Sequence, residues 1–116
     1  MTRVVRFHGD ALADLARQVA WLERNAAPSW LDRLQDDLTR AMELLRLYPG
    51  AGTRLEREAG VVLRRVPLPS TPYVIWYVYN ERRAHGDVWI VRLFHSRQKR
   101  PTPDPSRWFP AVETEQ

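Results

Sequence analysis

The chain has 116 residues, of which 44% are hydrophobic and 28% charged, so it can form one domain around one core and is too apolar to be disordered. It has no cysteine, which excludes disulfides, thiolate metal sites and a cysteine nucleophile. No apolar run reaches the ~18 residues of a membrane span, and the N-terminus lacks the apolar core of a signal peptide. We therefore expect a cytoplasmic protein that does not enter membranes.

The positive charge is concentrated in one part of the chain. The whole chain carries +4, and in residues 1–60 nine arginines balance nine acidic residues. Residues 61–100 carry seven arginines and Lys99 against only Glu81 and Asp87, a net charge of +6. Such a segment suits an anionic partner, either a nucleic acid or an acidic protein segment. A solvated arginine-rich face is the alternative interpretation.

The first half of the chain predicts a strand followed by two helices. Residues 2–7 are β-branched and predict a strand, after which Asp10 is placed to cap a helix that ends near Asn25. Its apolar positions recur every three or four residues, at Leu12, Leu15, Val19 and Leu22.

The second helix follows Pro28, with Ser29 and Asp32 as a capping box, and ends before Pro49. Its apolar stripe comprises Leu31, Leu34, Leu38, Ala41, Leu45 and Tyr48. We expect the two helices to form an antiparallel hairpin that covers a sheet.

The second half predicts a small, mostly antiparallel sheet. After a polar linker at 53–60, strands are expected at 61–68, 73–80 and 87–95, the middle one apolar on both faces and therefore central. The expected fold is an α+β domain over residues 1–100, in the order β-α-α-β-β-β. Residues 101–116 form a Pro-rich tail, expected to be extended or disordered, in which Trp108 and Phe109 either fold back onto the domain or anchor a partner.

The candidate functional residues gather near the end of the last strand. His95 falls there, and a histidine with an ordinary pKa of ~6.5 can act as a general acid or base, although a hydrogen-bonded strand-end histidine is the simpler interpretation. Arg97, Lys99 and Arg100 follow it and can contact phosphate or solvent. On the strands, Arg64 and Arg65 point to opposite faces, and Arg92 shares a face with His95 only if a bulge intervenes.

Aromatic residues of the middle strand divide between its two faces. Trp76 is expected in the core, whereas Tyr77 and Tyr79 share the other face with Tyr73, where they stack on bases or a partner helix, or form buried cross-strand pairs. The sequence offers no catalytic triad and no Gly-rich phosphate loop, and its three histidines are scattered. We therefore expect neither a metal nor a cofactor.

Five stretches carry a family resemblance over residues 3–101: "ALADLARQVAWLERN", "LTRAMELLRLYPGAGTRL", "VLRRVPL", "PYVIWYVYN" and "VWIVRLFHSRQKRP". In order and spacing, the chain resembles the RelE/ParE superfamily of toxins from bacterial type II toxin–antitoxin systems. The resemblance implies one of two activities. RelE-like members cut messenger RNA in the ribosome, using cationic side chains and a C-terminal tyrosine, and ParE-like members poison DNA gyrase.

The nuclease pattern is incomplete in this sequence. Arg64 or Arg65 matches the strand arginine and Arg97 matches the basic residue after the last strand. However, Tyr73 is followed by Val74 instead of arginine, and no tyrosine follows the last strand. The ending "RLFHSR" looks ParE-like, so the resemblance favours a gyrase-binding toxin. The alternative is a ribosome-dependent endoribonuclease with Arg64, His95 and Arg97 as its catalytic residues.

Either activity implies a cognate antitoxin, which we expect to present an acidic amphipathic segment within a toxin–antitoxin hetero-oligomer. The residues expected to contact the target or the antitoxin are Arg64, Arg65, Tyr77, Tyr79, Arg92, His95, Arg97, Lys99 and Arg100.

Overall fold

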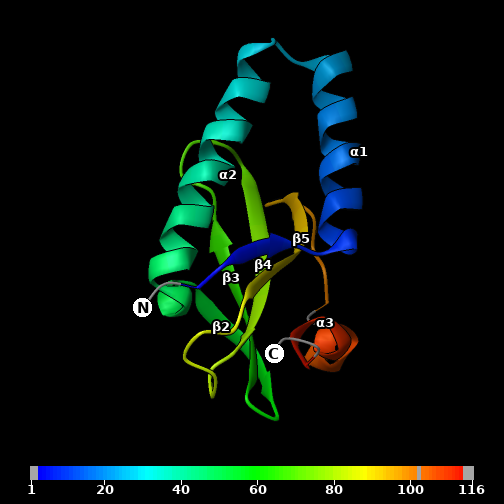
Figure 1. Ribbon diagram of the computed structural model, residues 1–116. Coiled ribbons are helices and arrows are strands. Elements are labelled where there is room, and N and C mark those ends of the chain that lie inside the picture. The colour runs from blue at the N-terminus through cyan, green and yellow to red at the C-terminus, as the bar shows by residue number, and fades with distance from the viewer. Residues whose placement is uncertain (1–2, 102, 114–116) are drawn as a thin grey trace.

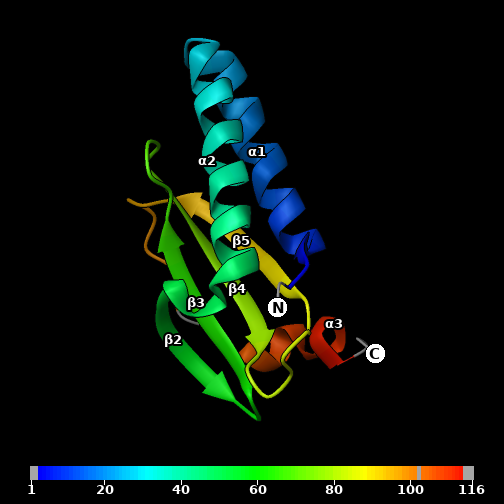
Figure 2. The ribbon, with the colours of Figure 1, turned by 60° about the vertical axis from the view of Figure 1, so that its left-hand side comes forward.

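A five-stranded sheet carries a helical hairpin on one face and the C-terminal segment on the other (Figures 1 and 2). The computed structural model describes residues 3–101 and 103–113. In chain order the elements are β1 (Val5–Phe7), α1 (Gly9–Asn25), α2 (Ser29–Leu47), β2 (Thr53–Glu58), β3 (Val61–Pro67), β4 (Tyr73–Asn80), β5 (Val88–His95) and α3 (Phe109–Glu113). The strand order is β1-β5-β4-β3-β2, with β1 parallel to β5 and the other neighbours antiparallel.

The predicted α+β class is confirmed, but the sheet contains one strand more than expected. Residues 53–58, expected within a polar linker, form the edge strand β2 and pair with β3. Its sequence, TRLERE, alternates charges and leaves most of its side chains in solvent. Charged side chains on an edge strand discourage pairing with another chain. The strand therefore forms through its backbone pairing with β3. Its sequence has no apolar periodicity from which a strand could be predicted.

Both helix caps differ from the sequence prediction. The His8 side chain caps α1, because its Nδ1 accepts a hydrogen bond from the backbone N–H of Asp10 at 3.0 Å. The predicted capping box is wrong, since α2 follows Pro28 without a side-chain cap. The predicted stripes also run too far, because Tyr48 is 65% exposed and Leu12 is 52% exposed.

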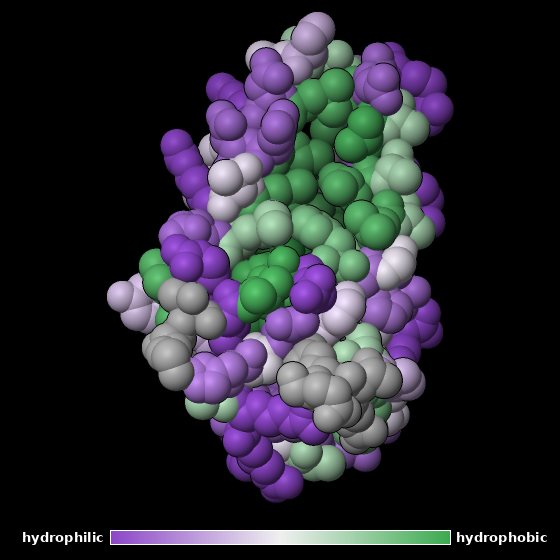
Figure 3. All heavy atoms as spheres, in the orientation of Figure 1, coloured by the Kyte–Doolittle hydropathy of each residue, from purple (hydrophilic) through white to green (hydrophobic). Residues whose placement is uncertain are grey.

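Two apolar layers enclose the central strand β4, whose residues 73–79 are all buried. Toward the helices, Tyr73, Ile75, Tyr77 and Tyr79 pack with leucines of both helices. On the face that is seen in Figure 3, apolar side chains also fill the hollow between α1 and α2. Among the described residues, no helix has both the length and the apolar character needed to cross a membrane.

The C-terminal segment closes the opposite face of the sheet. Pro105–Trp108 form a short 3-10 helix that continues into α3, so the expectation of an extended or disordered tail is wrong for these residues. Trp108 is only 1% exposed and packs with Val112 against Val74, Trp76 and Phe94. Of the two alternatives for Trp108, folding back onto the domain is therefore the one observed. Residues 102 and 114–116 of this tail lie outside the described residues.

A buried aspartate fastens the β3–β4 loop to α2. The Asp37 carboxylate accepts hydrogen bonds from the Thr71 hydroxyl at 2.6 Å, the Ser70 hydroxyl at 2.7 Å and the Ser70 backbone N–H. Burial raises the pKa of Asp37, but these hydrogen bonds outweigh burial, and the net pKa lies below its ordinary value of 3.8. The loop that joins two core strands thus depends on one ionised side chain.

We predict that Asp37→Asn lowers the free energy of unfolding by about 1–3 kcal/mol at pH 7, because buried donors lose their charged acceptor. Asp36→Asn, an exposed neighbour on the same helix, should change it by less than about 0.5 kcal/mol. Because the pKa of Asp37 is lower in the folded state than its ordinary value of 3.8, Asp37 contributes its full stabilisation to the free energy of unfolding above pH 3.8. This stabilisation is lost as the pH falls through the folded-state pKa. Urea unfolding at pH 7 and pH 3 measures both effects. An Asp37→Asn deficit that stays constant down to pH 3 would contradict this assignment.

Candidate functional site

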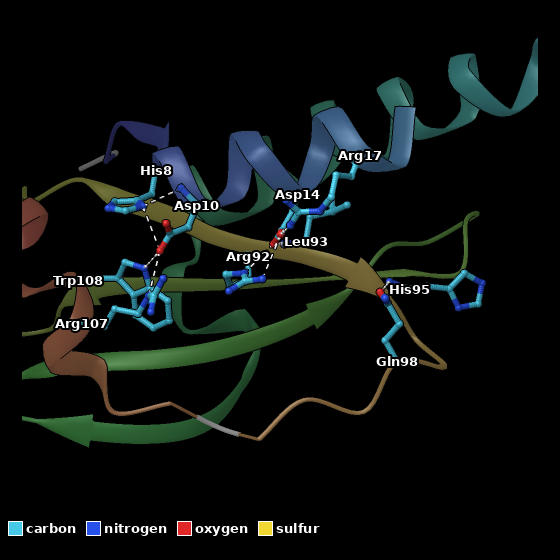
Figure 4. Close-up of polar contacts among 10 residues, drawn as sticks. All are labelled: His8, Asp10, Asp14, Arg17, Arg92, Leu93, His95, Gln98, Arg107 and Trp108. Carbon is cyan, nitrogen blue, oxygen red and sulfur yellow. Dashed lines mark hydrogen bonds and ion pairs between the residues drawn. The ribbon is translucent and has the colours of Figure 1, made fainter. Parts of the chain in front are cut away.

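The first helix is fixed to the last strand by one carboxylate. β1 pairs with β5 only as far as Ile90, so the next outward-facing backbone N–H of β5, at Leu93, has no strand beside it. Asp14 on α1 takes this place, accepting from the Leu93 N–H at 3.0 Å and from Arg92 at 2.7 and 3.1 Å (Figure 4). Arg17 contacts the same carboxylate. Asp14 is only 1% exposed, so both its charge and its acceptor capacity are met inside the protein.

This attachment places the later turns of α1 over the end of β5 and creates a groove of about 710 Å³. We call it the arginine groove. Its basic lining residues are Arg17, Arg24, His95, Arg97 and Arg100, and Gln18, Trp21, Tyr73 and Gln98 also line it. Among the described residues, Asp14 is the only acidic one in the lining. Because Arg92 and Arg17 already neutralise it, the groove is positively charged.

An apolar pocket of about 450 Å³ continues from the arginine groove toward the tip of the hairpin. The two cavities share Trp21, Tyr73 and His95 in their linings. The rest of its lining consists of Leu22, Asn25, Ala26, Ala27, Trp30 and Pro72. One continuous surface therefore offers cations at one end and apolar and aromatic side chains at the other.

His95 is half-buried where β5 ends, as predicted from the sequence. Its Nδ1 accepts a hydrogen bond from the Arg97 backbone N–H at 3.1 Å, and its ring meets Tyr73 edge-on at 5.7 Å between centroids. The backbone N–H of His95 donates to the Gln98 side chain at 3.0 Å. His95 thus shapes the turn that presents Arg97 and Gln98 to the groove.

The sequence and the fold are similar to those of known proteins. The family model of the ParE toxin of the type II toxin–antitoxin system parDE matches residues 5–100. The chain belongs to the ParE toxin family. The match covers α1, α2 and all five strands, and it confirms the superfamily inferred from the sequence.

Two solved structures share this ParE fold at low sequence identity. A chain of the chromosomal ParDE TA system from P. aeruginosa has a TM-score of 0.58 and 17% identity, over 81% of this chain and 96% of that one. A chain of the archaeal RelE–RelB complex from Pyrococcus horikoshii OT3 has a TM-score of 0.56 and 16% identity, over 85% and 100%. No curated protein matches in sequence.

Arg64 of this ParE-family chain is held by hydrogen bonds within the protein. Its Nε donates to the Tyr79 hydroxyl at 3.1 Å and its Nη1 to the Gly52 carbonyl at 2.9 Å. Tyr77 completes the same cluster by accepting from the Gly52 N–H and donating to the Pro49 carbonyl. Burial raises the pKa of Tyr77 to about 12, against the opposing effect of the Gly52 hydrogen bond. The phenol therefore stays protonated and donates throughout the physiological range.

The structure divides the residues expected at the site into three groups. His95, Arg97 and Arg100 line the arginine groove, and Lys99 is exposed in the same turn. Arg65 is exposed on the outer face of β3. Tyr77 and Tyr79 are buried under the helices, Arg64 is bonded to their cluster, and Arg92 is bonded to Asp14. These last four residues support the fold; the two tyrosines are buried, whereas Arg64 and Arg92 are half-buried.

The proposed catalytic set of Arg64, His95 and Arg97 is not gathered at one place. Arg64 pairs with Tyr77, whereas His95 pairs with Tyr73 on the same strand. Four residues of strand separate the two positions, roughly 13 Å at about 3.3 Å per residue. His95 and Arg97 share the groove, and Arg64 does not line it.

The contribution of α1 to this groove was not predicted from the sequence. Asp14, Arg17, Trp21 and Arg24 recur at steps of three and four, which places them on one face of the helix. This polar stripe runs beside the apolar stripe and could have been found from its spacing. Its pairing with Arg92 and Leu93, about 78 positions away in the chain, could not.

We predict that Arg64→Ala lowers the free energy of unfolding by about 1–2 kcal/mol, because the Tyr79 hydroxyl and the Gly52 carbonyl lose their donor. Its neighbour Arg65 is exposed and serves as the control, since Arg65→Ala should change stability by less than about 0.5 kcal/mol. Thermal or urea unfolding compares the two. Equal stability of Arg64→Ala and wild type would show that Arg64 is free for another role.

Proposed function

We propose that this ParE-family toxin acts in the cytoplasm by binding DNA gyrase and that a cognate antitoxin neutralises it in a hetero-oligomer. The observation that carries the proposal is the family match over residues 5–100. The two solved structures of the same fold come from a ParDE TA system and a RelE–RelB complex. Both names support an antitoxin partner for this chain.

Charge and apolar surface together support an acidic amphipathic antitoxin segment. Exposed basic residues such as Arg65, Arg97 and Lys99 lie on the sheet and at its end, where they would speed association with an acidic chain. The hollow between α1 and α2 presents apolar side chains (Figure 3). Buried apolar contacts would supply most of the affinity.

The positions of the candidate catalytic residues favour binding over RNA cleavage. Arg64 is committed to Tyr79 and Gly52 and lies apart from the groove that holds His95 and Arg97. No tyrosine follows β5 in the sequence, so no phenol is supplied from that segment. Of the three residues that the endoribonuclease alternative requires, the groove therefore brings together only His95 and Arg97.

The test is a gyrase assay with the purified chain. Added to gyrase, ATP and relaxed plasmid, the chain should block supercoiling and accumulate cleaved DNA held by gyrase. Equimolar antitoxin, encoded by an adjacent reading frame, should restore supercoiling. Mapping of 5′ ends in cells expressing the chain is the second readout. Unaffected gyrase together with messages cut at fixed codon positions would replace the proposal with the endoribonuclease alternative.

A further inference from the structure

We propose that the arginine groove binds a single strand of DNA, with phosphates on its guanidinium groups and an unpaired base stacked on Trp21. The charged residues that line the groove are mostly cations, and the half-exposed Trp21 lies among them. The choice of DNA over RNA rests on the proposed function, because gyrase works on DNA.

Free cations line the groove. Within the described part of the chain, the guanidinium groups of Arg24 and Arg97 have no hydrogen-bonding or ionic partner. Asp14 does not offset them, because Arg92 and Arg17 already hold its carboxylate. Unpaired guanidinium groups along one groove match the phosphates of a nucleic-acid backbone, whose binding releases counterions.

Arg100, which also lines the groove, carries an unsatisfied donor. Its Nε is buried without a hydrogen-bond partner in the described structure, and its guanidinium lies over the Phe94 ring at 5.5 Å. A buried N–H without an acceptor is costly. Arg100 also lines a smaller cavity of about 160 Å³ together with Arg92 and Arg107. A phosphate oxygen entering from the groove would supply the missing acceptor.

Trp21 supplies the surface for a base. It is 52% exposed, and it lines both the arginine groove and the apolar pocket. Stacking on an aromatic ring is the usual way in which proteins hold unpaired bases, whereas bases in a duplex keep their faces covered by their neighbours. The amides of Gln18 and Gln98, also in the lining, can donate to and accept from base edges.

The same groove fits an acidic peptide less well. A peptide helix needs a continuous apolar face, and the hollow between α1 and α2 provides one (Figure 3). The arginine groove instead places Arg24, Arg97 and Arg100 beside the half-exposed ring of Trp21. A groove of cations with an exposed aromatic ring provides the two kinds of contact that single-strand sites use.

Fluorescence anisotropy of labelled dT20 tests the proposal, because no gyrase is present and the result is independent of gyrase poisoning. The groove variant is Arg24→Gln/Arg97→Gln, and the matched control is Arg40→Gln/Arg65→Gln. The control removes the same charge from exposed positions on α2 and β3 outside the groove lining. All four arginines are exposed, so the variants should fold, and circular dichroism melting confirms it.

We expect the groove variant to weaken dT20 binding at least tenfold at low salt and the control to weaken it less than threefold. Losing two phosphate contacts should reduce the slope of log K against log salt by about 1.4, because each single-strand contact contributes about 0.7. Trp21→Ala should weaken binding by at least roughly fivefold, and Trp21→Phe by much less, because it keeps a stacking ring.

Three results would overturn the proposal: no saturable binding of dT20, equal losses in the groove and control variants, or an unchanged affinity of Trp21→Ala. Competition identifies any other occupant. Tighter binding of rU20 than of dT20 would assign the groove to RNA. Displacement of dT20 by polyglutamate at equal charge would assign it to an acidic peptide.

Discussion

The structure depends on the bond that Asp14 makes to the edge of β5. β1 pairs with only the first part of β5, as far as Ile90, and the carboxylate then occupies the place of a strand by accepting the Leu93 N–H and holding Arg92. A buried carboxylate is costly unless cations and donors satisfy it, and here both come from β5. The requirement for these partners fixes which face of α1 meets the sheet and how far along β5 it lies.

From this attachment follow the two surfaces to which we assign function. One stripe of α1 enters the core with Leu22, and the neighbouring stripe carries Arg17, Trp21 and Arg24 over the end of β5. The splay of the hairpin leaves the apolar hollow between α1 and α2 (Figure 3). At the start of the helix, Asp10 holds Arg107 and Trp108, and these hydrogen bonds outweigh burial and lower its pKa (Figure 4). The same helix thus organises the groove and anchors the C-terminal segment.

The elements that could be predicted are those whose buried side chains produce a periodic apolar pattern in the sequence. The apolar stripes of α1 and α2 and the doubly apolar β4 are of this kind, and all three were found. β2 was missed because its charged side chains face solvent and only its backbone pairs. The helical turn of the C-terminal segment was missed because its prolines predict an extended chain. The turn is stabilised by the burial of Trp108, which has no local pattern in the sequence. His95 and Arg97 were placed correctly at the strand end, whereas the roles of Arg64 and Asp14 depend on distant partners that no local pattern reveals.

The most direct test of this account is the hydrogen-exchange rate of the Leu93 backbone amide, measured by NMR in the wild type and in Asp14→Ala. An edge amide without a strand neighbour ordinarily exchanges by local opening, whereas one bonded to a buried carboxylate exchanges only when the structure opens more widely. We predict that Leu93 in the wild type is protected nearly as well as the amides of β4, and that Asp14→Ala removes this protection while β4 stays protected. Rapid exchange at Leu93 in the wild type would contradict the central role of Asp14.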